Sequence, residues 1–461
     1  MNKSLGEQFH NDPRVREAKE SLAKVLADYR NRITGVRPGD PALEERYEQW
    51  LHDTGRMRGR DLFFPYLGSG LGSGPLVELA DGSVKMDFIT GIGVHGTGHS
   101  HPAMLDAGID GALEDTVMQG NLQQGPVACA VMELFLQAAS GDGSRIAHCF
   151  LTSSGAMANE NAFKIIFQKN APASRFLAFR RCFTGRSLAT AQMTDKAAYR
   201  EGLPVTLHVD YVPFYNATRH DESILESVSV LREHLARHPG QYAGMCMELI
   251  QGEGGYYPGH REFFTALIEV LKEHHVAVMI DEVQSFGRTS SAFAFQYFGL
   301  QPLVDVVTVG KMSQVCATLY SEEYNPRPGL LSQTFTSSSA ALHASRRILQ
   351  DLLGGGYLGP EGTIMRMSER FRDHLRRLAS AYPEQVGGPF GLGAMVAFTF
   401  ADGQKDATVA FLKRLYRNGL MGFVAGGAPV RIRFLPPVMG ITDADIDAAA
   451  AIIEQTLGEE D

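Results

Sequence analysis

The sequence predicts an α/β protein: a large domain with a mainly parallel sheet flanked by helices, plus a smaller α+β domain. Three observations support this class. The chain of 461 residues is too long for one small core and fits two or three packed units. From about residue 100, short apolar runs alternate with helical segments. After about residue 340, a smaller unit of alternating helices and strands follows. Apolar runs of this length are typical of strands that helices cover on both faces.

The expected strands of the large domain are five apolar runs, each followed by polar or glycine-containing residues. They span residues 146–151, 176–179, 245–250, 276–280 and 304–309. A long helix is expected at 340–353, where the chain passes into the smaller unit.

The segment before the large domain is expected to form an arm and a hairpin. Residues 13–60 are polar and helical in pattern, with a Pro/Gly break at 35–41. A glycine- and serine-rich loop at 67–75 precedes residues 76–88, which alternate around an Asp-Gly turn and predict a β-hairpin. Whether that loop closes over a site stays open. We therefore expect an arm and part of the small domain in 1–95, the large domain in 96–345 and the C-terminal small domain in 346–461.

Composition excludes several classes of function. Hydrophobic residues make up 44% and charged residues 21% of the chain, as in an ordinary globular protein. The net charge of -9 repels polyanions, so nucleic acid is not an expected partner. Five scattered cysteines without a CxxC pair indicate a reducing compartment. No signal-peptide pattern and no apolar run near ~20 residues is present, so we expect a cytoplasmic protein without a membrane partner.

The most informative residues follow two of the expected strands. Asp281 ends the run at 276–280, and Lys311 follows the run at 304–309 after one glycine. Because the carboxyl ends of parallel strands meet at one crevice, the two side chains can meet. A lysine that forms a Schiff base and a carboxylate that keeps a pyridine nitrogen protonated suit pyridoxal phosphate. Taken alone, the pair fits a strand-end lysine and a turn aspartate equally well.

A phosphate site is a second candidate feature. A strand end, a turn of small residues at Ser154, Gly155 and Ala156, and a helix follow one another here. The free N–H groups and the dipole of a helix start favour a phosphate, and small residues let it approach. An ordinary serine-capped helix explains the same pattern.

Other motifs are weaker. Residues 91–96 have the spacing GxGxxG without a following helix, and residues 310–313 lack the upstream glycine of a Walker loop, so both nucleotide interpretations are discarded. His95, His99 and His101 lie close together, but no carboxylate or cysteine completes a recognisable ligand set. We expect structural histidines there and no metal.

Arginines and an aromatic residue supply further candidate contacts. Phe183 and Arg186 follow the second expected strand, where a ring face can stack on a planar group and an arginine can grip a carboxylate. A surface loop with a salt bridge explains them as well. Arg433 lies between apolar residues, and a buried arginine needs a partner. Glu253, just after the third expected strand, is a candidate for that partner.

Taken together, these segments resemble the class III aminotransferases. These are pyridoxal-phosphate (PLP) enzymes of fold type I that include ornithine, 4-aminobutyrate and lysine 6-aminotransferases. The resemblance covers about residues 60–455, and its most specific element is the run IDEVQSFGRT at 280–289, followed at family spacing by Gly310-Lys311. It implies a fold type I PLP-dependent transferase with its PLP-binding domain in 96–345.

The resemblance also implies roles for single residues. Lys311 would bind the cofactor covalently and then act as general base and acid, while Asp281 would pair with the pyridine nitrogen. Thr334 matches the threonine that the family donates to the phosphate from the neighbouring subunit, which implies a homodimer with shared active sites. The other implied cofactor contacts are Val283 and Phe183 on the two ring faces, Gln284 at the phenolic oxygen, and Ser154, Gly155 and Ala156 at the phosphate.

On the substrate side, Arg186 and Arg433 match the family's two carboxylate-binding arginines. Glu253 matches the glutamate that covers the second arginine when a distal amine is bound. A movable pair of this kind lets one pocket accept first a donor with no carboxylate near the reacting carbon and then a dicarboxylic acceptor.

Local sequence narrows the group without choosing a donor. Residues 159–164 resemble the 4-aminobutyrate enzymes, and residues 310–316 resemble the lysine 6-aminotransferases. The family's Gly-Gly-Asn-Pro is replaced by Thr-Ser-Ser-Ser at 336–339, and its His-Gly-Arg-Thr by Thr-Gly-Arg-Ser at 184–187. Both changes touch the substrate side of the pocket, so the donor stays open.

The sequence therefore predicts a PLP-dependent aminotransferase. It would move a terminal amino group from a small-molecule donor such as lysine, 4-aminobutyrate or ornithine to the 2-oxo acid 2-oxoglutarate by a ping-pong route. One alternative is a PLP enzyme of the same fold that acts on an amine without a carboxylate or catalyses racemisation. A non-catalytic PLP-binding regulatory protein is more remote, since binding alone needs no general base.

Overall fold

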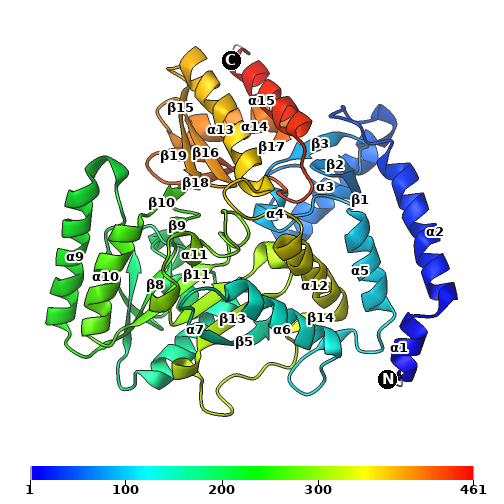
Figure 1. Cartoon of the computed structure of the whole chain (residues 1–461). Helices are drawn as coiled ribbons and strands as arrows, with labels where there is room; N and C mark the ends of the chain where they lie inside the picture. The colour runs from blue at the N-terminus through cyan, green and yellow to red at the C-terminus, as the bar shows by residue number, and fades with distance from the viewer. Residues whose placement is uncertain (1–2, 460–461) are drawn as a thin grey trace.

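The computed structural model describes residues 3–459, and its centre is a seven-stranded sheet (Figure 1). The strands lie in the order β5, β13, β12, β11, β8, β6, β7. Their bounds are β5 (Ile146–Thr152), β6 (Arg175–Phe179), β7 (His208–Val212), β8 (Tyr242–Met247), β11 (Ala277–Glu282), β12 (Val306–Val309) and β13 (Cys316–Ser321). All the strands expected from the sequence are confirmed, whereas β7 and β13 were not predicted.

The sheet is mainly parallel, as predicted. Strands β12, β11, β8, β6 and β7 pair in parallel, and β13 alone runs against its neighbours β12 and β5. Asp281 lies opposite Thr308, and Glu282 lies opposite Val309. Because Lys311 follows Val309 after a single residue, Asp281 and Lys311 come to the same edge of the sheet.

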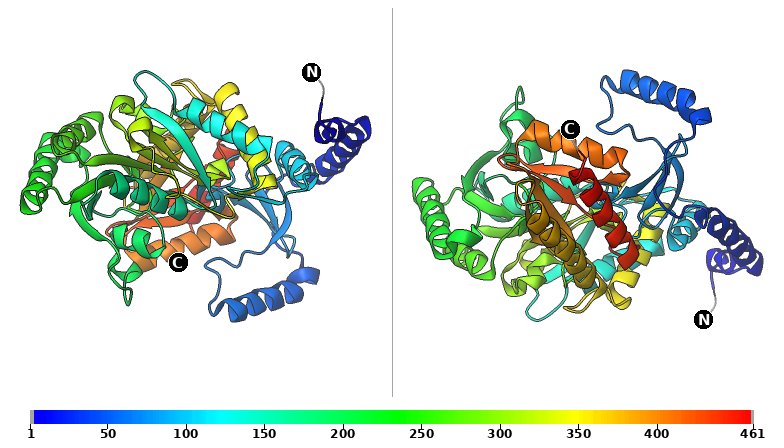
Figure 2. Two further views of the ribbon diagram at one scale, coloured as in Figure 1. Left: turned by 90° about the horizontal axis from the view of Figure 1, so that it is seen from below. Right: turned by 90° about the horizontal axis from the view of Figure 1, so that it is seen from above.

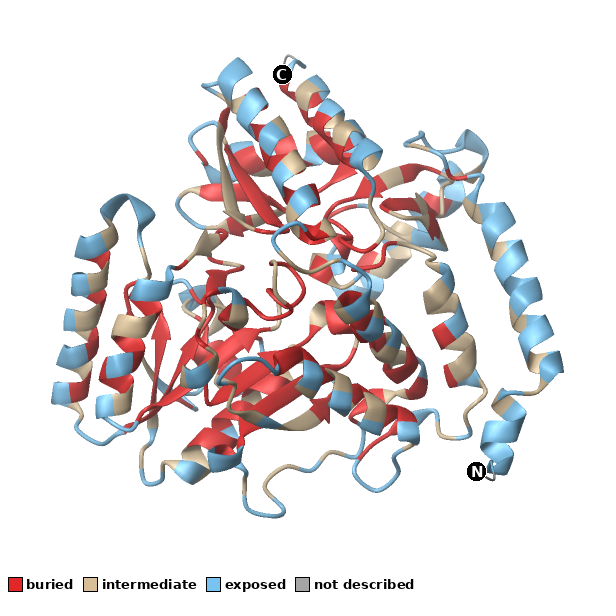
Figure 3. Cartoon of the chain, viewed as in Figure 1, coloured by how far each residue is buried: buried red, intermediate tan, exposed pale blue. Residues whose placement is uncertain are grey.

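Helices cover both faces of the sheet, which explains its apolar strands. Every residue of β8, β11, β12 and β13 is buried, and Figure 3 shows these arrows in red beneath the helices. The helices of this part of the molecule are α5 (Pro102–Ala112), α6 (Pro126–Ala139), α7 (Gly155–Lys169), α9 (His220–Arg237), α10 (Arg261–Glu273) and α12 (Ser339–Gly354). Helix α7 packs against β12 and β13, α10 packs against β11 and α9, and α12 packs against α5 and α6. The predicted helix at 340–353 is confirmed as α12.

Two four-stranded sheets form the smaller part of the molecule. One has the order β1, β2, β3, β17, and the other has the order β15, β16, β19, β18. The strands are β1 (Gly68–Ser73), β2 (Leu76–Leu79), β3 (Val84–Asp87), β15 (Val386–Leu392), β16 (Met395–Phe400), β17 (Leu420–Met421), β18 (Phe423–Gly426) and β19 (Val430–Phe434). Helices α13 (Thr363–Ala381), α14 (Lys405–Arg417) and α15 (Asp443–Leu457) lie with these sheets at the top of Figure 1.

The segment before the large sheet joins the C-terminal one. Strand β17 pairs in parallel with β3, so residues from both ends of the chain share a sheet. The predicted hairpin is confirmed as β2 and β3, with Gly82 in the turn at φ 80°. The division of the chain at 95 and 345 stays a prediction.

The glycine- and serine-rich segment is a strand rather than the expected loop. Residues 68–73 form β1, which pairs with β2. A Cβ atom on Gly72 would lie 2.4 Å from Cβ of His99 and 2.5 Å from the carbonyl oxygen of Leu76, so the strand needs glycine there. None of its residues lines the two cavities described below.

The polar N-terminal region forms the predicted helices. They are α1 (Leu5–His10), α2 (Pro13–Arg30) and α3 (Pro41–Arg58). Figure 2 shows all three at the periphery, with α3 standing away from the body in both views. No helix within residues 3–459 is long and apolar enough to cross a bilayer.

A buried arginine links the parts of the molecule. The side chain of Arg288, which follows β11, is 1% exposed. Its Nη1 donates to the carbonyl oxygen of Pro436 at 2.8 Å, and its Nη2 donates to that of Gly93 at 3.0 Å. One side chain thus joins the central sheet to a segment on either side of it in the sequence.

Candidate active site

The carboxyl edge of the central sheet opens into a cavity of about 220 Å³. A wider hollow of about 750 Å³ shares Phe183 and Lys311 with it and extends to β18. Arg186 and Glu253 line the wider hollow. The predicted residues that line the smaller cavity are Gly155, Ala156, Phe183, Asp281, Val283, Gln284 and Lys311.

Two hydrogen bonds hold Asp281 in the smaller cavity. The N–H of Val283 donates to Oδ1 at 3.0 Å, and Asn159 Nδ2 donates to Oδ2 at 2.8 Å. Burial raises the pKa of Asp281 to about 6, while these donors and the charge of Lys311 act to lower it. A carboxylate this deep is stable as an anion only beside a cationic group.

Asn159, which orients Asp281, was not predicted as a site residue. Its carbonyl accepts from the Thr308 hydroxyl at 2.8 Å, and its Nδ2 also donates to the carbonyl of Thr184 at 2.7 Å. One side of the amide must accept and the other must donate, so its orientation is fixed. The available signal was its position one helical turn after Gly155, on the same face of α7.

Lys311 lies in a tight turn directly after β12. Its φ of 53° is in the left-handed region, which costs a non-glycine residue about 1–3 kcal/mol. The short helix η4 (Lys311–Ser313) begins there. Burial and, next, the charge of Arg433 lower the pKa of Lys311 to about 8. The amine therefore exists as a mixture of charged and neutral forms near pH 8 and can act as nucleophile or base.

The start of α7 forms another wall of the cavity. Ser154 caps the helix, since its Oγ accepts from the N–H of Met157 at 3.2 Å. A Cβ atom on Gly155 would lie 2.7 Å from Val283 Cγ1, so glycine leaves the room that Val283 occupies. The first N–H groups of a helix have no partner within it, so those of Gly155 and Ala156 can bind an anion.

A buried ion pair joins Arg433, on β19, to Glu253, which lines the wider hollow. Arg433 on β19 has no exposed side-chain area, whereas the paired Glu253 is 29% exposed. Nη2 of Arg433 donates to the carboxylate of Glu253, and Nη1 donates to Oε1 of Gln284 at 3.4 Å. The expected pairing is thus present. Of the two side chains, only that of Glu253 reaches solvent.

Arg186 lies in the wider hollow and is exposed. Its Cζ is 3.4 Å from the ring centroid of Tyr199 and 5.9 Å from that of Phe183. Lys196 Nζ donates to the hydroxyl of Tyr199 at 3.2 Å. Tyr199 and Lys196, which sequence reasoning missed, therefore support and flank the guanidinium that faces the hollow.

A second buried carboxylate, Glu248, also lines the smaller cavity. It accepts from the N–H of Phe183 at 2.8 Å and from that of Gly252 at 3.0 Å. Burial, and next the charge of Asp281, raise the pKa of Glu248 to about 8. Glu248 therefore fixes the backbone of Phe183, and its proton occupancy changes with pH in the neutral range.

Thr334 lies outside both cavities and is exposed. It precedes β14 (Ser337–Ser338), which pairs with β4 (Met118–Gln119). The structure of one chain therefore does not bring Thr334 to the other predicted residues.

The neighbouring histidines have structural partners. His99 Nε2 lies 2.9 Å from Asp87 Oδ2. Nδ1 of His101 accepts from the N–H of Ala103 at 3.2 Å and caps α5. These contacts agree with the structural role expected for His99 and His101.

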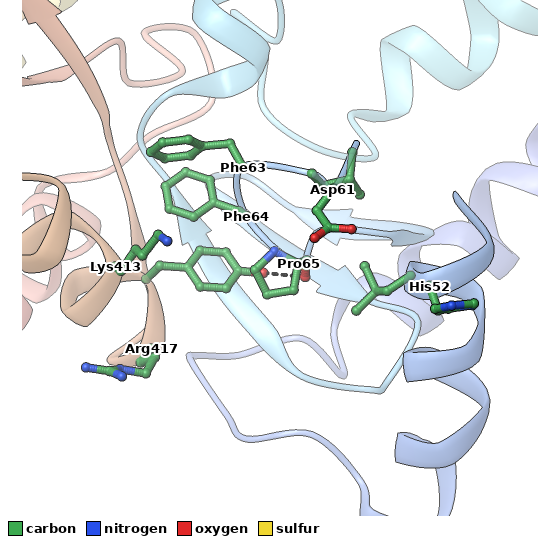
Figure 4. Close-up of a pocket in the computed structure, with 10 residues that line it drawn as sticks. His52, Asp61, Phe63, Phe64, Pro65, Lys413 and Arg417 are labelled. Carbon is green, nitrogen blue, oxygen red and sulfur yellow. Dashed lines mark hydrogen bonds between the residues drawn. The ribbon is translucent and has the colours of Figure 1, made fainter. Parts of the chain in front are cut away.

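A separate cavity of about 460 Å³ lies between α3 and α14 (Figure 4). The rings of Phe64 and Tyr416 stack in its wall with centroids 4.6 Å apart, and Lys413 lies at its edge. It shares no lining residue with the two active-site cavities, so it is not part of this site.

The arrangement fits pyridoxal phosphate. Asp281 is a buried carboxylate that needs a cationic partner, and Lys311 supplies an amine in the same cavity. The start of α7 offers free N–H groups beside small residues, as a phosphate requires. Each part of the cofactor therefore meets a group of matching chemistry.

Comparison with known proteins defines the class. The family model described as "Aminotransferase class-III" matches residues 70–457, so the chain belongs to the class III aminotransferases. It is 26% identical over 401 residues to the acetylornithine aminotransferase of Synechocystis sp., which covers 84% of this chain and 88% of that one.

Solved structures share the fold. The lysine aminotransferase from M. tuberculosis has a TM-score of 0.77 at 24% identity, over 88% of this chain and 98% of that one. The ornithine aminotransferase from Toxoplasma gondii has a TM-score of 0.76 at 21% identity, over 89% and 94%. The predicted class is thereby confirmed: the protein is a PLP-dependent aminotransferase of fold type I.

Proposed function

We propose that this aminotransferase takes a terminal amino group from an amino acid and passes it to 2-oxoglutarate by a ping-pong route. The buried Arg433, covered by Glu253 beside Lys311, is the observation that carries the proposal. In this state the pocket offers no free cation next to the reacting carbon from that side. It therefore suits a donor whose reacting carbon bears hydrogen rather than a carboxylate.

When bound, pyridoxal phosphate supplies an aldehyde and a ring that accepts electrons from the reacting carbon. Asp281 would hold a proton at the pyridine nitrogen, and Asn159 orients that carboxylate. The amine of Lys311 would hold the cofactor and would move a proton to and from the reacting carbon of the substrate. Its lowered pKa suits both directions of that transfer.

Two arginines then bind the carboxylates of the two substrates. Exposed Arg186, with Tyr199 beneath it, grips the distant carboxylate of the donor in two-pronged fashion. In the second half-reaction the solvent-reaching Glu253 swings away, and Arg433 binds the carboxylate next to the keto group of the acceptor. One pocket thus serves a distal amine and a dicarboxylic acid.

Candidate donors are lysine, ornithine, 4-aminobutyrate and N-acetylornithine. The last is added because acetylornithine aminotransferases are among the relatives, although sequence reasoning did not name it. Thr184 and Ser187 stand where the family has histidine and threonine, next to Arg186. These replacements leave the choice among the candidate donors open.

We also propose a homodimer in the cytoplasm. Thr334 would reach the phosphate of the partner chain, which explains why it lies outside the cavities of its own chain. All five cysteines are free thiols, which supports a reducing compartment.

The first experiment is the visible spectrum of the holoprotein while each donor is added without a keto acid. Loss of the band of the lysine-bound cofactor with one donor, and its return with 2-oxoglutarate, is the expected result. A band that no donor changes would contradict terminal-amine transfer and favour action on other amines or racemisation.

Replacement of Lys311 tests the mechanism itself. Lys311→Ala should abolish turnover, because no other amine lies in the smaller cavity to move the proton. The exposed Lys405→Ala serves as the matched control and should keep wild-type turnover. Normal transamination by Lys311→Ala would refute the assignment.

A further inference from the structure

We propose a second binding site, for a divalent transition-metal ion such as Zn²⁺, where the first turns of α9 and α10 meet. His220 begins α9, His260 is the N-cap of α10, and Glu262 lies in the first turn of α10. One ligand atom from each of the three lies within 4.8 Å of the others. Within residues 3–459 this is the only such group of three.

The distances fit a tetrahedral shell. His220 Nε2 is 2.9 Å and His260 Nδ1 is 3.9 Å from the same oxygen, Oε2 of Glu262. Bonds of about 2.1 Å at tetrahedral angles place neighbouring ligand atoms about 3.4 Å apart. The observed values lie on either side of that spacing, so small rotations of partly exposed side chains bring all three atoms to one ion.

Tyr215 orients both imidazoles. Its hydroxyl lies 2.7 Å from Nδ1 of His220, so Nδ1–H can donate to it while Nε2 keeps its lone pair for the metal. The ring of His260 stacks on Tyr215 with centroids 5.9 Å apart and an angle of 22°. Tyr215 in turn packs against Phe263, whose ring centroid is 5.6 Å away. The ligands are thus held by a residue anchored in the core.

Charge at the site favours a cation in spite of the helix dipoles. Helix starts repel positive ions, but Glu262 supplies a negative charge and Asp221 adds another. Oδ1 of Asp221 is 3.7 Å from Nε2 of His220, near enough to become a fourth ligand in place of water. The neighbouring Arg219 is paired with Glu222 and Glu226.

The set of ligands selects the kind of metal. Two imidazoles and a carboxylate suit Zn²⁺ and its neighbours in the first transition row, whereas Mg²⁺ and Ca²⁺ prefer oxygen alone. His260 makes no side-chain hydrogen bond to the start of α10, so metal binding costs the helix no cap.

The ion would join two helices and take no part in the transfer reaction. Helices α9 and α10 lie side by side at the left edge of Figure 1. None of the ligands lines the active-site cavities. The expected consequence is a Zn²⁺-dependent rise in thermal stability without a change in turnover.

Calorimetric titration of the EDTA-treated holoprotein with zinc chloride tests the site. We expect one ion per chain with micromolar affinity or better. His260→Ala and Glu262→Gln should each weaken binding at least about tenfold, and Tyr215→Phe should weaken it about tenfold by releasing His220. Each variant should also show a smaller Zn²⁺-dependent rise in Tm than the wild type.

His148 provides a matched control. It lies 2.7 Å from Glu322 as a histidine–glutamate pair without a second imidazole, so His148→Ala should bind Zn²⁺ like the wild type. The proposal fails if the wild type binds no Zn²⁺ at micromolar concentrations. It fails equally if His260→Ala and Glu262→Gln bind as tightly as the wild type, since the ion would then sit elsewhere.

Discussion

Asn159 favours the charged form of Asp281, because its side chain donates a hydrogen bond to that carboxylate. Asn159→Ala removes one of the two hydrogen bonds to that carboxylate. A bond to a charged group contributes about 1.5–3 kcal/mol, so we expect PLP to bind at least about tenfold more weakly. Fluorescence titration of the apoprotein with PLP measures this.

Asn161→Ala is the control for that prediction. Asn161 lies on the same helix and is buried, but its Nδ2 has no hydrogen-bond partner in the described structure. Its replacement should leave PLP affinity within about twofold of wild type. Equal affinities for all three proteins would show that Asp281 does not depend on Asn159.

Glu248 predicts a dependence of stability on pH. Its pKa is raised from 4.5 to about 8 in the folded protein. Between those values the folded state binds more protons than the unfolded state, so the contribution of Glu248 to stability falls as pH rises. Glu248→Gln cannot titrate. Its apoprotein should therefore lose roughly 1–4 kcal/mol less unfolding free energy between pH 5 and pH 8 than the wild type does.

Urea unfolding at both pH values checks this, with the exposed Glu384→Gln as control. For each protein, the change in unfolding free energy between pH 5 and pH 8 is compared. A loss of stability that the glutamine causes equally at both pH values therefore does not affect the result. Parallel pH profiles for Glu248→Gln and the wild type would contradict the raised pKa.

The start of helix α7 depends on one glycine, Gly155. Gly155→Ala would place a Cβ atom 2.7 Å from Val283 Cγ1. Val283 or the helix start must then move, at a cost of about 1–3 kcal/mol, which should weaken PLP binding about tenfold or more. Gly108→Ala in α5 meets no atom within 4 Å and should bind PLP normally. Normal binding by Gly155→Ala would show that the contact is not needed.

The strands that the sequence predicts differ physically from those that it does not predict. The predicted strands are apolar because helices cover both their faces. Strand β7 begins with a histidine and lies at the sheet edge, so its pattern is weaker. Strand β13 begins at Cys316, shortly after the Lys311 turn, and was not predicted. The glycines of β1 suggested a loop, but Gly72 serves a close backbone approach.

The site residues also divide into those that the sequence predicts and those that it does not. Lys311 and Asp281 could be placed because strand ends converge at one edge. Glu248 and Asn159 could not, since their roles depend on burial and on backbone partners in the loop after β6. Tyr199 was missed because its contact with Arg186 depends on the path of an irregular loop.

In the proposed dimer, each active site should contain residues from both chains. Thr334→Ala should weaken PLP binding about tenfold, by loss of one hydrogen bond to a charged phosphate. The defect should appear in the site of the partner chain rather than in the site of the chain that carries it. A hybrid of two differently tagged chains can separate these cases.

One chain of the hybrid carries Lys311→Ala and the other carries Thr334→Ala. If Thr334 acts across the interface, the one site with a lysine receives an intact Thr334 from its partner. The site with the lysine should then bind PLP with wild-type affinity, and the hybrid should show about half the wild-type turnover per dimer. If Thr334 acts within its own chain, the same site carries the defect, and the hybrid should match the weak PLP affinity of the Thr334→Ala protein. Because the chains are the same in both cases, only the origin of the threonine decides between the two affinities.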